Sequence, residues 1–481
     1  MNRAITWKIP DILKATKGDI LSENPGESFS RIVIDSKKAA PGDLFVAIKG
    51  LRFDGHDFVE DAIKNGARGI IVSKNRAGSI ISKAPEASGV AIVAVDDTIF
   101  ALGALAAFLR IQLNVKTIAI TGSSGKTTTR EMVASVLGMR YSTLSTAGNL
   151  NNEIGVPLTL LSLDFSHEVA VIEMGMNHKG EIGRLSAMTR PDIGVITNIG
   201  PVHLEGVGGI DGVADAKAEM FEHMSPGGTA VLNADDSYGP KLAERTQNRV
   251  LFFGLNQNAD IRAENIREDE NGIIFKLILP EDTAEVCVRG WGRFLVSDAL
   301  ASAATGYLMG MDAMQIAEGL GRFSPVSGRM SVFKTENDVY VIDDTYNANP
   351  DSMSAAVATL TGMKGAGKKI LVAGDMLELG DEAPGFHEQI GSIAAKDGVS
   401  RLYITGQYAA RTAFGARREG MSGSEIFVGT CEDILKDLVA IVSPGDSVLI
   451  KGSRAMGMEK IAGRFIEKGA RPLWSDTGRG K

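Results

Sequence analysis

A glycine-rich turn after an apolar run carries the clearest chemistry in this sequence. Residues 118–121 are mostly apolar, and Gly-Ser-Ser-Gly-Lys-Thr-Thr follows at 122–128. Such a turn directs backbone N–H groups toward one point before a helix N-terminus, which is typical of a nucleotide-phosphate site. Lys126 would reach the β- and γ-phosphates, and the Thr127 hydroxyl would ligate Mg²⁺. Ile120 stands where the usual P-loop has its first glycine, so the turn is the shorter Gly-x-x-Gly-Lys-Thr form. The residues expected to bind phosphates are Gly122, Ser123, Ser124, Gly125, Lys126, Thr127 and Thr128.

Two residues at the ends of other apolar runs are candidates for a metal site. Glu173 ends the run 169–173, and His203 lies in the loop after the run 193–197. Mg²⁺ beside phosphates usually takes one or two carboxylates, so a P-loop in the same sheet favours Glu173 as a ligand. Taken alone, Glu173 is better explained as a solvated residue at a strand end. A lone loop histidine is more often structural or solvated than a ligand.

Lys217 and the asparagine-rich segment 148–157 each allow two interpretations. Lys217 is most simply a surface lysine of a short helix, because an ammonium group cannot ligate a metal. It would become a ligand only as a carbamate formed with CO₂, and nothing in the spacing indicates that modification. Three of the four residues 149–152 are asparagine. Asparagines are typical of turns and caps, but this segment also lies where a substrate would approach the P-loop.

The turn 323–328 and the segment 342–353 are similarly ambiguous. Arg329 follows the turn and is either a solvated hinge residue or a cation that reaches the γ-phosphate on domain closure. The segment IDDTYNANPDSM is either a turn with a helix cap or a site in which Asp344 binds a ribose hydroxyl.

These residues must be positioned by strands, and β-rich runs alternate with helical patterns along the chain, which predicts parallel α/β architecture. Ligands of open α/β sheets bind beyond the carboxyl ends of strands. The predicted strands are 31–35, 44–48, 69–72, 90–95, 117–121, 169–173, 193–197, 230–233, 273–278, 339–343, 369–374, 401–405 and 447–451. The predicted domains are 1–96, 97–328 and 329–481, with boundaries at a strand end and at the Pro/Gly turn 323–328.

Bulk composition excludes several classes of protein. The chain of 481 residues is 44% hydrophobic and 23% charged, which is ordinary for a globular protein of about three domains. Its net charge of −8 argues against non-specific nucleic-acid binding. Two cysteines cannot form a disulfide framework, which favours a reducing cytoplasm. The apolar run 99–109 is too short to span a membrane, so we expect a buried helix and no membrane insertion.

Several segments in order along the chain resemble the Mur ligases of peptidoglycan synthesis, a family that shares its P-loop partly with folylpolyglutamate synthases. They are TGSSGKTT, GNLNNEIGVP, IEMGMNHKGEI, TNIGPVHLEG, AKAEMF, IDDTYNANPDSM, GDMLELG and IKGSRAMGME. The likeness runs from Asp35 to about Glu459. It implies a UDP-sugar-binding α/β domain, a central P-loop ATPase-type parallel-sheet domain and a C-terminal Rossmann-like domain that closes over ATP.

The resemblance also implies a role for each matching residue. Lys126, His203, Lys217 and Arg329 would be catalytic, and Thr127, Glu173, His203 and carbamylated Lys217 would hold two Mg²⁺ ions. Arg329 would contact the γ-phosphate and Asp344 the ribose. The residues expected to bind UDP-MurNAc are Asp35, Ser36, Lys49, Gly50, Asp54 and His56. Those expected near the peptide substrates or the closing interface are Asn151, Asn152, Asn347, Asn349, Asp375, Lys451, Ser453 and Arg454.

Two positions depart from the family pattern. The Ser-Arg pair on the uridine side is Ser36-Lys37 here, and lysine lacks the planar fork of arginine. The adenine-binding stretch Gly-x-His-Asn-x-x-Asn-Ala is Gly-Arg-Phe-Leu-Val-Ser-Asp-Ala at 292–299. Asp298 therefore replaces an asparagine, and an ionised carboxylate accepts hydrogen bonds but donates none. We expect weaker adenine recognition at Asp298, or a donor from another group.

The activity that the resemblance implies is ATP-dependent amide ligation through an acyl phosphate. Segments DDTYNANP, GDMLELG and KGSRAMGME favour the member that joins D-Ala-D-Ala to UDP-MurNAc-tripeptide, acting as a cytoplasmic monomer. The third residue of that peptide is left open. The rivals are a sibling Mur ligase, a folylpolyglutamate synthase and a non-catalytic P-loop switch.

Overall fold

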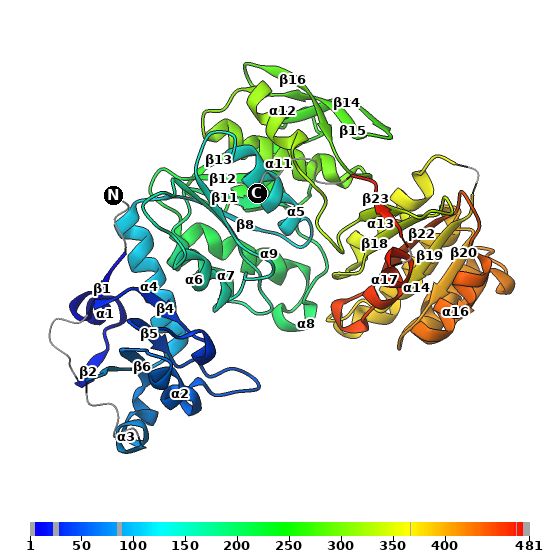
Figure 1. Cartoon of the computed structure of the whole chain (residues 1–481). Coiled ribbons are helices and arrows are strands. Elements are labelled where there is room, and N and C mark those ends of the chain that lie inside the picture. Colours follow the sequence, from blue (N-terminus) through cyan, green and yellow to red (C-terminus); the bar gives the residue numbers. More distant parts are fainter. Residues whose placement is uncertain (1–4, 23–27, 84–88, 366, 468, 475–481) are drawn as a thin grey trace.

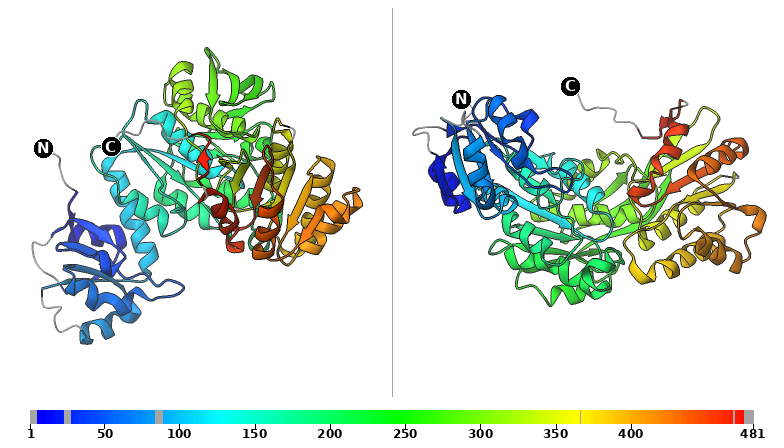
Figure 2. Two further views of the ribbon diagram at one scale, coloured as in Figure 1. Left: turned by 45° about the vertical axis from the view of Figure 1, so that its right-hand side comes forward. Right: turned by 90° about the horizontal axis from the view of Figure 1, so that it is seen from below.

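Three sheets follow one another along the chain in this computed structural model, which describes residues 5–22, 28–83, 89–365, 367–467 and 469–474. Figure 1 shows the central unit between the N-terminal unit in blue and the C-terminal unit in yellow to red. Figure 2 shows the three units along a curved path, with the central unit again in the middle. No helix among the described residues is both long and apolar enough to cross a membrane.

The first sheet has the strand order β2-β7-β6-β5-β4, with β2 antiparallel to β7 and the other neighbours parallel. Its strands are β2 (Asp19–Ser22), β4 (Arg31–Val33), β5 (Asp43–Val46), β6 (Gly69–Ser73) and β7 (Ala91–Val95). β1 (Trp7–Lys8) pairs with β3 (Ser28–Phe29). The helices are α1 (Ile9–Thr16), α2 (Val59–Lys64), α3 (Lys74–Lys83) and α4 (Thr98–Leu113).

The helix expected at 99–109 is α4, and most of its apolar side chains are buried. Leu102 and Leu105 pack in the core of the first sheet, while the helix also contacts α6 and α7 of the central unit. α4 therefore joins two units. The predicted boundaries at 96/97 and 328/329 stay predictions.

The central sheet has the order β16-β15-β14-β13-β12-β11-β8-β10-β9 and is parallel from β9 to β14. Its strands are β8 (Lys116–Thr121), β9 (Thr143–Ser145), β10 (Val169–Glu173), β11 (Ile193–Ile196), β12 (Thr229–Asn233), β13 (Arg249–Gly254), β14 (Ile261–Asp269), β15 (Gly272–Ile278) and β16 (Thr283–Val288). Its helices are α5 (Lys126–Leu137), α6 (Gly155–Leu160), α7 (Glu181–Thr189), α8 (Leu204–Val207), α9 (Ile210–Ala218), α10 (Gly239–Ala243), α11 (Phe294–Leu308) and α12 (Ala313–Gly321).

The order of the central sheet explains where a site forms. β8 lies between β10 and β11. After β8 the chain adds β9 and β10 on one side of this strand and then crosses over to add β11 on the other side. Such a switch point leaves a crevice beyond the carboxyl end of the strand. Apolar side chains of α5, α11 and α12 cover one face of the sheet, and those of α6, α7 and α9 cover the other.

The third sheet has the order β21-β20-β19-β22-β18-β17-β23, with β17 and β23 antiparallel and the rest parallel. Its strands are β17 (Ser331–Lys334), β18 (Tyr340–Asp344), β19 (Lys369–Ala373), β20 (Arg401–Ile404), β21 (Ile426–Val428), β22 (Ser447–Lys451) and β23 (Arg471–Pro472). Its helices are α13 (Pro350–Gly362), α14 (Ala383–Lys396), α15 (Ala409–Arg418), α16 (Cys431–Ile441) and α17 (Glu459–Ile466).

Every predicted strand has a counterpart in the structure, with ends shifted by a few residues. The strands that the sequence analysis does not predict are β1, β2, β3, β9, β13, β14, β16, β17, β21 and β23. Among these, β14 and β16 alternate buried and exposed positions over much of their length. Their exposed faces carry charged residues, which dilute the apolar signal that reveals the parallel central strands.

Candidate active site

The glycine-rich turn lies between β8 and α5, as the sequence predicts. Gly125 has φ +79°, and a Cβ there would lie 2.3 Å from Asp298 Oδ1. A Cβ on Gly122, at φ +153°, would lie 1.8 Å from Thr197 Oγ1. Both positions therefore require glycine. Ser124 N donates to Asn198 Oδ1 at 2.9 Å, which fixes the turn against the loop after β11.

Lys126 is half-buried at the start of α5, and Nζ donates to Gly122 O at 2.8 Å. Burial lowers the pKa of Lys126 to about 8, while nearby Glu173 opposes that shift. The ammonium group is thus held in a poorly solvated position where an anion would stabilise it.

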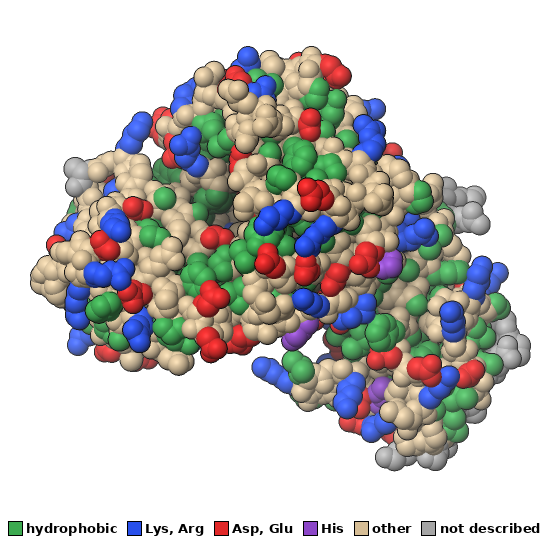
Figure 3. Space-filling view, turned by 180° about the vertical axis from the view of Figure 1, so that it is seen from behind, with side chains coloured by type: hydrophobic (Ala, Val, Ile, Leu, Met, Phe, Trp, Pro, Cys, Tyr) green, Lys and Arg blue, Asp and Glu red, His purple; other side chains and the backbone are tan. Residues whose placement is uncertain are grey.

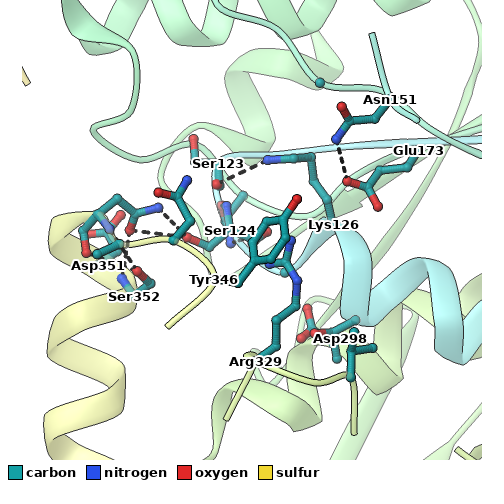
Figure 4. A pocket seen from close by; sticks show the side chains of 18 of the residues that line it. Ser123, Ser124, Lys126, Asn151, Glu173, Asp298, Arg329, Tyr346, Asp351 and Ser352 are labelled. Atoms are coloured by element: carbon teal, nitrogen blue, oxygen red, sulfur yellow. Dashed lines mark hydrogen bonds between the residues drawn. The ribbon is translucent and has the colours of Figure 1, made fainter. Parts of the chain in front are cut away.

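A cavity of about 900 Å³ opens beside the P-loop, between the central and third sheets. Figure 4 shows side chains of both units converging on it, with Lys126 and Glu173 on one side and Arg329 on another. Of the predicted site residues, it is lined by Ser123, Ser124, Gly125, Lys126, Thr128, Asn151, Asn152, Glu173, His203, Asp298, Arg329, Asp344, Asn347, Asn349 and Lys451.

Glu173 is buried at the end of β10 and is not a solvated strand-end residue. Asn151 Nδ2 donates to Glu173 Oε1 at 2.8 Å. Oε2 has no hydrogen-bond partner in the described part of the chain, and Arg130 Nη1 forms an ion pair with it at 3.7 Å. A buried carboxylate oxygen without a donor beside the P-loop suits a Mg²⁺ ion. No group of three or more His, Cys, Asp or Glu side chains among the described residues forms a metal cluster by itself.

Lys217 is buried on α9, so the surface-lysine interpretation is wrong. Desolvation, followed by repulsion from Lys126, lowers the pKa of Lys217 well below its ordinary value. No hydrogen bond or ion pair joins its ammonium nitrogen to another described residue. The lowered pKa favours the neutral amine, which is the form that reacts with CO₂.

His203 precedes α8 in a left-handed conformation, with φ +51°. Its Nδ1 lies 2.5 Å from Oε2 of Glu378, which belongs to the third unit. The close contact with the His203 ring lowers the pKa of the Glu378 carboxyl. His203 is thus held by a residue far away in sequence.

The third unit supplies a cation and an aromatic ring to the cavity. The Arg329 guanidinium lies over the Tyr346 ring at 4.1 Å. Asp344 Oδ2 accepts from Lys451 Nζ at 2.6 Å, and Oδ1 accepts from Met330 N at 3.1 Å. The buried Asp344 charge is therefore compensated within the unit.

Asn349, in the segment 342–353, both caps a helix and lines the cavity. Its side chain caps α13 by accepting from Ser352 N at 2.8 Å, in a capping box. Its amide also donates to Ser124 Oγ at 3.0 Å and so joins the third unit to the P-loop.

The other predicted residues lie outside the cavity lining. Lys49 bridges to Asp54, and His56 lies between Asp54 and Ser73. Asp35 accepts from Lys37 N at 3.1 Å. The remaining ones are Ser36, Gly50, Gly122, Thr127, Lys217, Asp375, Ser453 and Arg454. Asp375 accepts from the backbone amides of Gln407 and Tyr408, which orders the turn after β20.

Several lining or supporting residues are not predicted. Tyr346, Asp351 and Leu51 line the cavity, and Arg130 donates to Thr146 O and Gly148 O. Tyr346 and Asp351 lie within the segment 342–353, so its motif offered a signal. The sequence signal for Glu378 was weaker, because its partner His203 belongs to another unit and lies far away in the chain.

Family models cover the three units in order. The Mur ligase family, catalytic domain, matches residues 28–113, and the Mur ligase middle domain matches 120–306. The Mur ligase, glutamate ligase domain matches 328–454.

The chain belongs to the Mur ligase family.

This Mur ligase is similar to named proteins over most of its length. It is 37% identical to the UDP-N-acetylmuramoyl-tripeptide–D-alanyl-D-alanine ligase of Escherichia coli, over 91% of this chain and 94% of that protein. The crystal structure of MurF from Acinetobacter baumannii superimposes with a TM-score of 0.87 and 34% identity, over 97% of this chain and 100% of that one. MurF from Thermotoga maritima in complex with ADP gives a TM-score of 0.79 and 29% identity, covering 91% and 97%.

Proposed function

We propose that this Mur ligase joins D-alanyl-D-alanine to UDP-N-acetylmuramoyl-tripeptide and converts ATP to ADP and phosphate. The match over more than nine-tenths of both chains to the Escherichia coli ligase of that name carries the proposal. The P-loop cavity supports the use of ATP, and so does the likeness to MurF in complex with ADP.

The reaction proceeds in two transfers. The terminal carboxylate of the tripeptide attacks the γ-phosphorus of ATP, which gives an acyl phosphate and ADP. The amine of D-alanyl-D-alanine then attacks the acyl carbon, and the tetrahedral intermediate expels phosphate. The Lys126 ammonium and the Arg329 guanidinium stabilise the charge on the transferred phosphoryl group, since both line the cavity.

Residues of the central unit fit two Mg²⁺ ions, which would neutralise the phosphates when bound. Thr127 and Glu173 would hold one ion, and the free Oε2 of Glu173 supports this assignment. His203 and Lys217 would hold the other, with Lys217 carbamylated. Burial of Lys217 supports the carbamate, because a neutral amine adds to CO₂ and the resulting anion lies near the Lys126 cation.

Closure of the third unit protects the acyl phosphate from water. The contacts that already join the central and third units include those between Ser124 and Asn349 and between His203 and Glu378. The predicted domains 1–96, 97–328 and 329–481 then divide the work into binding of the UDP-sugar, ATP chemistry and closure.

The remaining assignments concern the cell and the partners. The substrates are small molecules, and the protein acts as a cytoplasmic monomer without nucleic acid. Figure 3 shows acidic and basic side chains interspersed over one face, without a broad basic area among the residues described there, which supports the absence of a nucleic-acid partner.

Phosphate release across a matrix of UDP-peptides and amines tests the proposal. UDP-MurNAc-tripeptide with D-alanyl-D-alanine should release phosphate, and the same peptide with a single amino acid or with glutamate should not. Release with a single amino acid would favour a sibling Mur ligase, and release with glutamate a folylpolyglutamate synthase. ATP binding without phosphate release from any pair would favour a P-loop switch and overturn the ligase proposal.

A further inference from the structure

One carboxyl group that lines the cavity has an oxygen without a hydrogen-bond partner among the described residues. Asp298 lies on α11 and is 5% exposed. Its Oδ1 accepts from Thr129 Oγ1 at 3.0 Å, whereas the buried Oδ2 has no hydrogen-bond partner among the described residues. Because Asp298 lines the cavity, a ligand there can supply the missing partner.

The surroundings of Asp298 disfavour a negative charge. The face of α5 toward it presents Gly125 and Thr129, and β13 and α12 add apolar side chains to the core around α11. The cations of α5 are engaged elsewhere, since Lys126 donates to Gly122 O and Arg130 to Gly148 O. Arg329 is the charged group that favours ionisation of Asp298, and its guanidinium stacks on Tyr346. Figure 4 shows Arg329 and Asp298 on the same side of the cavity.

Burial has a larger effect on the pKa of Asp298 than these contacts have. Desolvation raises the pKa of Asp298 to about 7, although the Thr129 hydrogen bond and Arg329 oppose the shift. At neutral pH the neutral carboxylic acid is therefore abundant before any ligand binds. A neutral acid both donates and accepts, as an amide does.

The cavity beside Asp298 has the chemistry of a purine site. Its wall next to the start of α11 is apolar and includes Phe294, Leu295, Phe323, Pro325 and Val326. A flat base packs against such a wall while its phosphates reach the P-loop. The edge of adenine that carries N7 and the N6 amino group presents one acceptor and one donor.

We propose that Asp298 binds ATP as a neutral carboxylic acid, with Oδ2–H donating to adenine N7 and the carbonyl oxygen accepting from N6. This inference rests on the proposed use of ATP. It makes nucleotide affinity depend on one proton, which an asparagine at this position would not do. An ionised Asp298 would lack the donor for N7 and would suit the N1–H and N2–H₂ donors of guanine instead.

Binding of MgADP and MgGDP between about pH 6 and about pH 8 tests the proposal, with calorimetry on the full chain. For a group of pKa about 7 that must be protonated to bind, affinity for MgADP should fall about tenfold over this range. Asp298→Asn should retain MgADP binding and abolish that component of the pH dependence. Comparing the two proteins cancels the titration of the nucleotide and of Lys126.

Thr129→Val provides a second variant that acts through the same proton. It removes the hydrogen bond that favours the ionised form, so the midpoint of the affinity loss should move to higher pH. A difference infrared spectrum on nucleotide binding should show a protonated carboxyl band that Asp298→Asn lacks.

Three results would overturn the inference. Parallel pH profiles for the parent and Asp298→Asn would mean that another group carries the proton. MgGDP binding at about pH 6 that is as tight as MgADP binding would mean that a neutral Asp298 does not recognise the adenine edge. Absence of nucleotide binding by the parent at every pH would instead contradict the proposed function, and with it this inference.

Discussion

At the scale of single residues, two lysines beside the P-loop repel each other, Lys217 buried and Lys126 half-buried. Desolvation, followed by repulsion from Lys126, lowers the pKa of Lys217. Keeping both ammonium groups charged in these surroundings costs free energy, so the arrangement favours the loss of one proton. A carbamate on Lys217 would turn that repulsion into an attraction.

Replacing Lys217 with Ala should reduce phosphate release about 100-fold or more, because a metal ligand and its charge are lost. Removing dissolved CO₂ should slow the parent reversibly, and bicarbonate should restore it. Lys241→Ala is the matched control, since Lys241 is exposed on α10. Parent-like activity of Lys217→Ala would make Lys217 a structural residue only.

Glu173→Gln removes the negative charge of Glu173, a residue expected to bind Mg²⁺, with little change in side-chain shape. Glutamine keeps the shape and can still accept from Asn151, but it offers the ion no anionic oxygen. The Mg²⁺ concentration for half-maximal phosphate release should rise about tenfold or more. Glu168→Gln is the control, because Glu168 is exposed just before β10 and bonds Ser142 N. An unchanged Mg²⁺ dependence would remove Glu173 from the metal site.

At the scale of secondary-structure elements, the N-terminus of α13 couples stability to the site. Asn349 caps this helix and also donates to Ser124 of the P-loop. Oδ1 accepts for the cap and also accepts from Ser124 Oγ at 3.4 Å, whereas Nδ2 only donates to Ser124 Oγ, at 3.0 Å. An aspartate at this position therefore removes the Nδ2 donation alone.

Asn349→Ala should lower the free energy of unfolding by about 1 kcal/mol and also slow turnover, because both contacts are lost. Asn349→Asp should keep the cap, and hence the stability, while still slowing turnover. Thr430→Ala removes the equivalent capping box of α16, outside the cavity, and should cost similar stability without changing turnover. Denaturant unfolding and phosphate release measure the two effects. Equal turnover of Asn349→Asp and the parent would show that the Nδ2 donation to Ser124 is dispensable.

At the scale of the whole molecule, contacts between the central and third units determine how far the cavity is closed. The His203–Glu378 contact is one of them, and next to it a Cβ on Gly380 would lie 3.0 Å from Glu205 Cγ. The segment 375–380 therefore packs closely on the loop around α8.

Glu378→Ala should shift the free protein toward a more open arrangement, because one end of that contact is lost. Small-angle scattering should then give a larger radius of gyration without nucleotide, and the difference should shrink when MgATP and UDP-peptide favour closure. Glu382→Ala, an exposed change in the same region, is the control. Identical scattering of Glu378→Ala and the parent would show that the contact does not contribute to closure.

The sequence predicts well those features that are built from residues close together in the chain. The P-loop is a strand, a turn and a helix in direct succession, so residue types alone indicate its position and its need for glycine. The predicted strands are also local features, because parallel strands buried on both faces appear as short apolar runs. The polar residues at their ends then fall at one edge of the sheet, and many of them line the cavity.

The ionisation and the pairing of the site residues depend on the tertiary structure. Lys217 resembles a surface lysine in sequence, but packing buries it. Asp298 would be an ordinary carboxylate in an extended chain, yet burial raises its pKa to about 7, although the Thr129 hydrogen bond opposes that shift. His203 meets Glu378 only because the third unit folds over the central one. A side chain's charge depends on solvent exclusion and on neighbours distant in sequence, so residue order alone determined the chemistry available and folding determined its protonation and partners.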